Sequence, residues 1–268
     1  MMPTITFRFV VGVAVVSTLL GMAAGAQVTA TCKGMGSVGA VLYGEQNLKG
    51  APYSATVKAT RDQRLADGNA IHGAATTHQA RDSAGRTMSQ MSAGCNYGPD
   101  GQLVPLIRVT VNDPESRTSL SWGVNDSSPK VVRIVHRPEP VPLSPAEKVQ
   151  RQQVAQMRPQ SHTEVHSENL GSKIIVGVMA DGTRTTRTTI PAGEEGNDLP
   201  LVTVEETWTA RDLHLIVLRI YDDPRSGQNK VEVVELNQGE PDPALFAAPA
   251  GYGLEEQGVK AIPSTEVK

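Results

Sequence analysis

A succession of short runs in which apolar and polar residues alternate most constrains the fold of this chain. The pattern is clearest in residues 171–221, where Ile174, Val176 and Val178 fall on one side of an extended chain. A period of two that is rich in β-branched residues predicts a β-strand. Asp181-Gly182 follows this run, and we expect a two-residue hairpin turn there because glycine tolerates positive φ.

The same alternation recurs along most of the chain and indicates a mainly β protein. Turn residues such as Gly, Asp, Asn and Pro separate the runs, as in antiparallel meanders. The run 213–221 is apolar on both faces and is expected to be the central strand. The other predicted strands cover residues 53–65, 70–80, 86–91, 104–111, 118–124, 131–136, 183–189, 202–208 and 230–236. Together they predict a large antiparallel sheet with one or two short helices.

A proline-rich stretch, residues 138–168, divides the β pattern into two halves, residues 52–137 and 169–254. Within it, Ser144-Pro145-Ala146-Glu147 forms a capping box with proline at the first helical position, so a short helix is expected to about Met157. The stretch is either a linker or a helix that crosses the sheet. We expect the two halves to share one sheet or core.

The N-terminus has the pattern of a secretory signal. Arg8 supplies a positive charge, residues 9–22 are an apolar run, and Ala24-Gly25-Ala26 matches an A-x-A cleavage site. We expect residues 1–26 to be removed and the mature protein to be periplasmic or extracellular. The alternative is an uncleaved anchor, but the run falls short of the ~20 residues that span a bilayer.

The two cysteines support export. In an oxidising compartment Cys32 and Cys95 are expected to form a disulfide, and closing a loop of about 60 residues would stabilise the fold by ~4 kcal/mol on the chain-entropy model. The alternative is two unpaired thiols. Residues 27–51 are rich in glycine and expected to be a flexible arm, and residues 255–268 a polar tail.

Composition and motifs argue against several activities. The net charge of −3 disfavours nucleic acid as a partner, because phosphate binding needs a basic surface. Gly34-Met35-Gly36-Ser37-Val38-Gly39 matches a dinucleotide motif, but no strand–turn–helix surrounds it. His162 and His166 would share a metal on a helix, but in a strand they lie roughly 13 Å apart. We therefore expect no cofactor and no metal.

Acidic pairs occur at Glu194-Glu195, Glu205-Glu206 and Asp222-Asp223. Adjacent strand residues face opposite sides, so Glu205 and Glu206 cannot act on one atom. No G-x-S-x-G, H-E-x-x-H or Walker motif is present, and we expect a protein that is not an enzyme. An enzyme whose site is assembled from distant residues is the alternative.

Two features suggest binding rather than catalysis. The Thr-rich run 183–189 carries Arg184 and Arg187, which are candidates for a surface that meets a polar partner; the alternative is an ordinary solvated face. Trp122 and Trp208 are the only tryptophans, and each either lines a pocket or anchors a core.

Several segments resemble a group of secreted bacterial hypothetical proteins across nearly all of the mature chain. They are PYSATV (52–57), LADGNAI (65–71), RDSAGRT (81–87), GSKIIVGVMADGTRTT (171–186) and PDPALFAAPAGY (241–252). The closing D-P-x-L-F-x-x-P-x-G-Y is also similar to the ends of periplasmic lipoprotein-carrier-like half-barrels. That resemblance implies a curved, half-barrel-like antiparallel meander whose concave face, closed by short helices, holds an acyl chain. The proline-rich insertion after Arg137 departs from it.

The sequence thus predicts an exported, non-enzymatic envelope protein that binds a lipid or other apolar ligand on a curved sheet, with peripheral membrane association. The alternatives are a structural or signalling module that binds an envelope protein, and the enzyme with a dispersed site. The oligomeric state stays open.

We expect the exported protein to begin at Gln27, because signal peptidase cuts after the small residue of an A-x-A site. Intact mass and N-terminal sequencing of protein expressed from the full gene measure this. An Ala24→Lys, Ala26→Lys variant should retain its leader. A mature protein that still begins at Met1 would contradict the signal assignment.

Overall fold

The structure is a computed structural model that describes residues 42, 44, 48–98, 100–124, 128–139, 142–156, 163–190 and 196–257. The expected signal segment, the glycine motif at 34–39, Cys32, the pair Glu194-Glu195 and the end of the expected tail lie outside these residues. The disulfide between Cys32 and Cys95 therefore stays a prediction.

Strands dominate the described chain. The first half holds β1 (Tyr53–Arg64), β2 (Ala70–Arg81), β3 (Thr87–Tyr97), β4 (Leu103–Asp113), β5 (Thr118–Gly123) and β6 (Val131–His136). Helix α1 (Pro145–Gln156) follows. The second half holds β7 (Thr163–Ile175), β8 (Val178–Thr189), β9 (Leu201–Ala210), β10 (Leu215–Asp223) and β11 (Gly227–Asn237). A 3-10 helix, η1 (Pro243–Phe246), and β12 (Gly253–Gln257) complete it.

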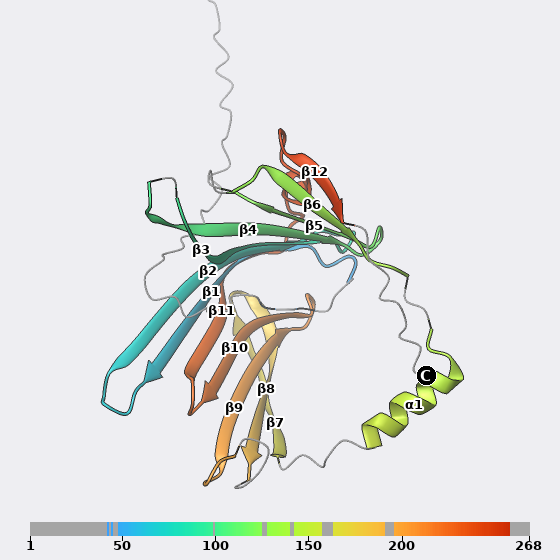
Figure 1. Ribbon diagram of the computed structural model, residues 1–268. Coiled ribbons are helices and arrows are strands. Elements are labelled where there is room, and N and C mark those ends of the chain that lie inside the picture. Colours follow the sequence, from blue (N-terminus) through green and yellow to red (C-terminus); the bar gives the residue numbers. More distant parts are fainter. Residues whose placement is uncertain are drawn as a thin grey trace, which may run out of the picture.

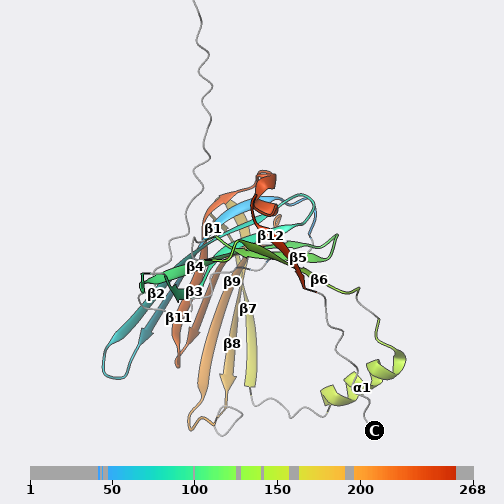
Figure 2. The ribbon, with the colours of Figure 1, turned by 45° about the horizontal axis from the view of Figure 1, so that its top comes forward.

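All the strands belong to one open, strongly curved 12-stranded sheet with the order β12-β6-β5-β4-β3-β2-β1-β11-β10-β9-β8-β7 (Figures 1 and 2). The predicted mainly β fold is confirmed. The two halves share the sheet because β1 pairs with β11. Two expectations need correction: β12 pairs with β6 in parallel, and β10 lies toward the β7 end of the sheet rather than at its centre.

The parallel pair has a simple cause. After β11 the chain crosses the sheet surface through η1, and it then enters β12 in the same direction as β6. This places Glu255 opposite Arg133 at the edge of the sheet. Part of the expected polar tail is thus an edge strand.

The hairpin between β7 and β8 turns at Val176-Gly177, not at Asp181-Gly182 as expected. Val176 and Gly177 have φ values of 48° and 82°, and Ile175 is opposite Val178, as in a two-residue primed turn. Gly182 instead lies within β8 beneath the ring of Trp208, where an added Cβ would come within 2.7 Å of the ring. Glycine at position 182 therefore permits close packing against Trp208 and does not form a turn.

The two faces of the sheet carry separate apolar cores. We call the face that bears Val57 of β1 the inner face and the face that bears Met88 of β3 the outer face. The inner core packs mainly on β1 and β8–β11 and includes Val57, Leu215 and Trp208. The outer core packs on β2–β6 beneath η1 and includes Met88 and Phe246.

The described part of the expected arm belongs to the inner core. Leu42 and Ala51 are buried, and Gly44 forms a β-bridge with Leu215. A Cβ on Gly44 would lie 2.6 Å from the carbonyl oxygen of His214, so only glycine permits this approach. These residues are therefore not a loose arm, because their burial fixes them against β10.

A buried arginine joins this segment to the sheet. Arg81, at the end of β2, is 1% exposed. Its Nε donates to the Ala51 carbonyl at 2.9 Å, its Nη2 donates to the Leu213 carbonyl, and its guanidinium lies 5.0 Å from the Tyr53 ring centroid. Burial raises the pKa of Tyr53. One side chain thus connects β2, the segment before β1 and the turn between β9 and β10.

Helix α1 begins at the predicted capping box. The backbone N–H of Ser144 donates to Glu147 Oε2 at 2.8 Å, and the backbone N–H of Glu147 donates to Ser144 Oγ at 3.3 Å. The described side chains of the helix are exposed, and it stands apart from the sheet (Figure 1). The helix therefore does not cross the sheet, and the linker role of residues 138–168 stays a prediction. In the described chain, no helix has the length and apolarity needed to span a membrane.

We expect Arg81→Lys to lower the free energy of unfolding by about 3 kcal/mol, because one ammonium group cannot reach both carbonyls in the guanidinium's geometry. Urea unfolding followed by tryptophan fluorescence measures it. Arg64→Lys at the exposed end of β1 is the matched control and should change stability by less than about 0.5 kcal/mol. Equal midpoints for the two variants would contradict the role of Arg81.

Candidate functional site

The C-terminal segment covers part of the outer face. Asp242 caps η1 by accepting a hydrogen bond from the backbone N–H of Ala244 at 2.9 Å. Phe246 is buried in the outer core, and the guanidinium of Arg86 lies 5.1 Å from its ring centroid. The hydroxyl of Tyr252 donates to the carbonyl of Gly123 at 3.0 Å. Both ends of the segment are thus attached to the sheet.

Between these attachments lies the outer pocket, a cavity of about 340 Å³. The sheet supplies its floor and the C-terminal segment its cover. Its lining is apolar apart from the amide of Gln90, and none of the lining residues is ionisable. The residues are Met88, Gln90, Val109, Trp122, Ala244, Leu245, Ala247, Ala248, Pro249 and Ala250.

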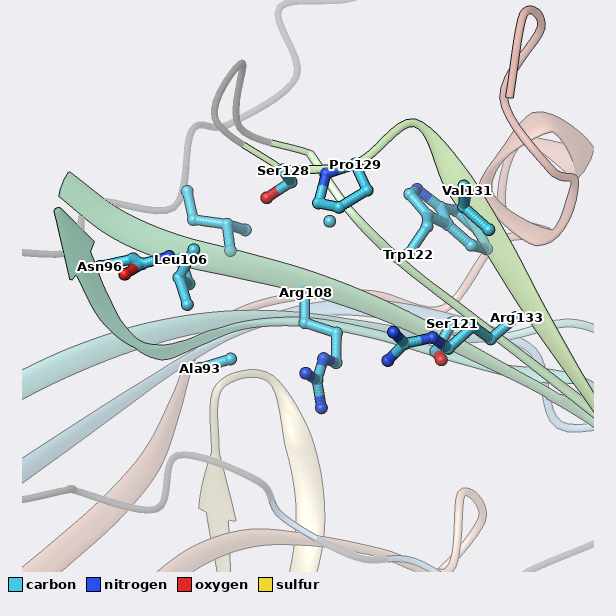
Figure 3. A pocket seen from close by; sticks show the side chains of 12 residues that line it. Ala93, Asn96, Leu106, Arg108, Ser121, Trp122, Ser128, Pro129, Val131 and Arg133 are labelled. Atoms are coloured by element: carbon cyan, nitrogen blue, oxygen red, sulfur yellow. The ribbon is translucent and has the colours of Figure 1, made fainter. Parts of the chain in front are cut away.

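A second cavity, the inner pocket, lies on the same sheet region and has a volume of about 210 Å³ (Figure 3). Arg108 of β4 and Arg133 of β6 line it together with Ser121 of β5. In Figure 3 the side chain of Arg133 extends past Ser121 toward that of Arg108. Asn96 and Ser128 add polar groups to its wall.

Glycine at position 123 shapes the inner pocket. An added Cβ there would come within 2.5 Å of Cβ and Oγ of Ser128. The absence of a side chain therefore lets Ser128 lie against β5 at the pocket wall. Pro129 continues the wall beside it (Figure 3).

The two tryptophans are buried, as the core-anchor alternative expected, but they differ in surroundings. Trp208 packs on Gly182, and the ammonium of Lys173 lies 3.7 Å from its ring centroid. Trp122 belongs to the outer core and lines both pockets. Only Trp122 therefore stands beside a candidate ligand site.

The expected partner-surface residues Arg184 and Arg187 lie on opposite faces of β8, because they are three residues apart in a regular strand. Arg184 donates to Glu168 at 2.8 Å and to Glu206 at 3.1 Å in neighbouring strands. Arg187 is exposed and has no ion pair with a described residue. One surface cannot use both, and partner binding by either stays a prediction.

The acidic pair Glu205-Glu206 also divides between the faces. Glu205 accepts from Arg219 at 2.6 Å. Glu206 accepts from Trp208 Nε1 at 2.7 Å, and this bond, together with Arg184, lowers the pKa of Glu206. Both carboxylates therefore stabilise cross-strand contacts.

The histidine and metal expectations are only partly covered by the structure. His166 lies in β7, whereas His162 is outside the described residues. Among the described residues, no three His, Cys, Asp or Glu side chains gather closely enough to hold a metal.

Comparisons with known proteins do not identify a family. No family model and no curated protein matches the sequence. An uncharacterised conserved protein from Thermus thermophilus is 12% identical over 77% of this chain and 91% of its own, with a TM-score of 0.38. MucB is 11% identical over 76% and 60%, and a DUF1329 family protein from Desulfovibrio piger is 9% identical over 74% and 90%, each with a TM-score of 0.29. Scores this low carry no inference about ligand, partner or location.

Sequence reasoning named Trp122 as a residue that either lines a pocket or anchors a core, but it located neither pocket. The closing segment was recognised only through a resemblance, although its four alanines and Pro249 signal a cover that leaves space. Arg108 and Arg133 are far apart in sequence and lie in separate predicted strands. Only the strand register brings them to one face.

A cross-strand network on β7–β9 predicts a pH effect. Arg211 donates to both oxygens of Asp181, each at 2.7 Å, and Ser172 donates at 2.6 Å. The Arg211 bonds, then the Ser172 bond, lower the pKa of Asp181 to about 2. The ionised Asp181 carboxylate therefore stabilises the folded state above its unfolded pKa of about 3.9. This stabilisation is lost as the pH falls through the pKa of the folded state.

We expect NMR titration of Asp181 to show this low pKa, and Arg211→Gln to return it toward the ordinary range. Arg187→Gln removes the same charge elsewhere on the sheet and should leave it low. A normal Asp181 pKa in the unsubstituted protein would contradict the network.

Proposed function

We propose that this protein is a non-enzymatic binding protein of the cell envelope that holds a small apolar ligand or one acyl chain in the outer pocket. The observation that supports the proposal is the apolar cavity of about 340 Å³ between the sheet and the C-terminal segment. Ligand pockets are concave and mostly apolar, with few polar groups that orient the ligand. Gln90 is the polar side chain available for that purpose here.

The composition of the cover explains the space. Ala244, Ala247, Ala248 and Ala250 contribute only methyl groups to the lining that Trp122 shares from the sheet. An apolar pocket of this kind gives an apolar molecule a surface on which it can leave water. Each methylene that a ligand buries contributes about 0.8 kcal/mol, which favours a hydrocarbon chain.

The lining favours binding over catalysis. None of the residues around the outer pocket can donate or accept a proton near neutral pH. Several cover residues are exposed, so a polar head group attached to the chain would remain in solvent. The proposed location in the envelope rests on the signal pattern of residues 1–26.

Quenching by a brominated chain tests the proposal. We expect 11-bromoundecanoate to lower tryptophan fluorescence by contact with Trp122, whereas undecanoate should not. Trp122→Phe should abolish quenching while Trp208 still fluoresces. Ala247→Phe should raise the Kd about tenfold or more by filling the cavity, a loss of at least about 1.4 kcal/mol.

Ala66→Phe, in the exposed turn after β1, adds the same ring far from the pocket and should bind like the unsubstituted protein. Native mass spectrometry of protein purified from its own envelope fraction should also reveal a bound chain that is chemically unchanged. Quenching that persists in Ala247→Phe, or a ligand recovered as a cleaved product, would count against a non-enzymatic carrier at this site.

A further inference from the structure

We propose that the inner pocket binds an anionic phosphate group, held between Arg108 of β4 and Arg133 of β6. The pocket is a cavity of about 210 Å³ on the inner face, and its walls include two arginines, two serines and an asparagine. This proposal does not depend on the outer pocket, because the polar groups it uses lie on the opposite face of the sheet.

The strand register fixes the arrangement. Thr110 is opposite Ser121, and Ser121 is opposite Arg133, so all three share the inner face. Arg108 is two residues before Thr110 in the same strand and therefore shares that face. Arg133 thus lies opposite Ser121, and Arg108 lies opposite Gly123, two residues further along β5 on the same face.

The charges in the pocket are unbalanced. The lining contains two guanidinium groups and no carboxylate. Arg108 has no ion pair with any described residue. Arg133 Nε lies 3.9 Å from Glu255 Oε2, and both side chains are more than half exposed, so this pair is weak. An anion would therefore gain attraction without displacing a strong internal partner.

The donor set suits a phosphate. A guanidinium presents parallel N–H groups that bind two oxygens of a phosphate, and two such groups from different strands can contact different oxygens. The hydroxyl of Ser121, which Figure 3 shows beside the guanidinium of Arg133, can donate to a further oxygen.

Isothermal titration calorimetry with inorganic phosphate at low ionic strength measures binding at this site. We expect Arg108→Gln and Arg133→Gln each to raise the Kd about tenfold, since hydrogen bonds to charged groups are the strong ones. Arg187→Gln is the matched control: it removes another exposed arginine, from β8, and should not change the Kd. Arg64→Gln is a second control, because Arg64 is exposed at the end of β1, and this variant should also leave the Kd unchanged.

Glu255→Gln provides a gain-of-function test. Removing this carboxylate frees Arg133, so phosphate affinity should increase severalfold. The change should disappear in Arg133→Gln, Glu255→Gln, because the two residues then no longer interact. Thermal unfolding of each variant checks that the fold is retained.

Flotation with vesicles distinguishes two sources of the phosphate. Binding to phosphatidylglycerol vesicles but not to phosphatidylcholine vesicles, lost in Arg108→Gln, would support a lipid head group. Phosphate binding without vesicle binding would support a soluble phosphate compound. No heat from phosphate with the unsubstituted protein, or equal Kd values for Arg108→Gln and Arg187→Gln, would overturn the proposal.

Discussion

The pairing of β1 with β11 is the interaction on which the rest of the structure depends. It places Val57 opposite Val233 and Ala59 opposite Val231, and it joins the two halves of the chain into one sheet. The loop that it closes includes most of the described chain, but the entropic cost of closure grows only slowly with length. Burial of four aliphatic side chains at this seam offsets that cost.

This seam also divides the inner face into two chemical regions. On the β11 side, aliphatic residues and Trp208 face the segment around Leu42 and are buried. On the β2 side, the same face passes through Thr77 and Gln79 and becomes a surface of hydroxyls and arginines on β4–β6. The outer face shows the reverse order, because its core lies on β2–β6 beneath Phe246. Each region of the sheet therefore has one packed face, and both pockets lie in the β3–β6 region.

The fold class was predictable because alternating runs record which face of a strand is buried. The turn between the predicted strands 53–65 and 70–80 and the capping box at Ser144 were also predictable, because local residue chemistry decides both. The turn at Val176-Gly177 was not, because it places a β-branched residue at positive φ while Asp181-Gly182 offers better turn residues. Packing of Trp208 on Gly182 decided between the two, and that contact joins residues far apart in sequence.

The candidate sites were less predictable than the fold. The outer pocket depends on how far the C-terminal segment stands above Trp122, which the positions of Phe246 and Tyr252 set. The inner pocket depends on register across three strands. Arg184 illustrates the opposite case: its sequence context indicated a surface for partners, but the register places it between Glu168 and Glu206.

The unequal edges of the sheet limit how copies of this molecule can associate. Within the described chain one edge is β7, with 13 residues and a bulge at Gly171, and the other is β12, with 5 residues that include Glu255 and Glu256. Head-to-tail growth of a fibre would require the long edge of one copy to pair with the short acidic edge of the next, which leaves most of the longer strand without partners. Edge pairing between two β7 strands would instead be related by a two-fold axis and would stop at a dimer.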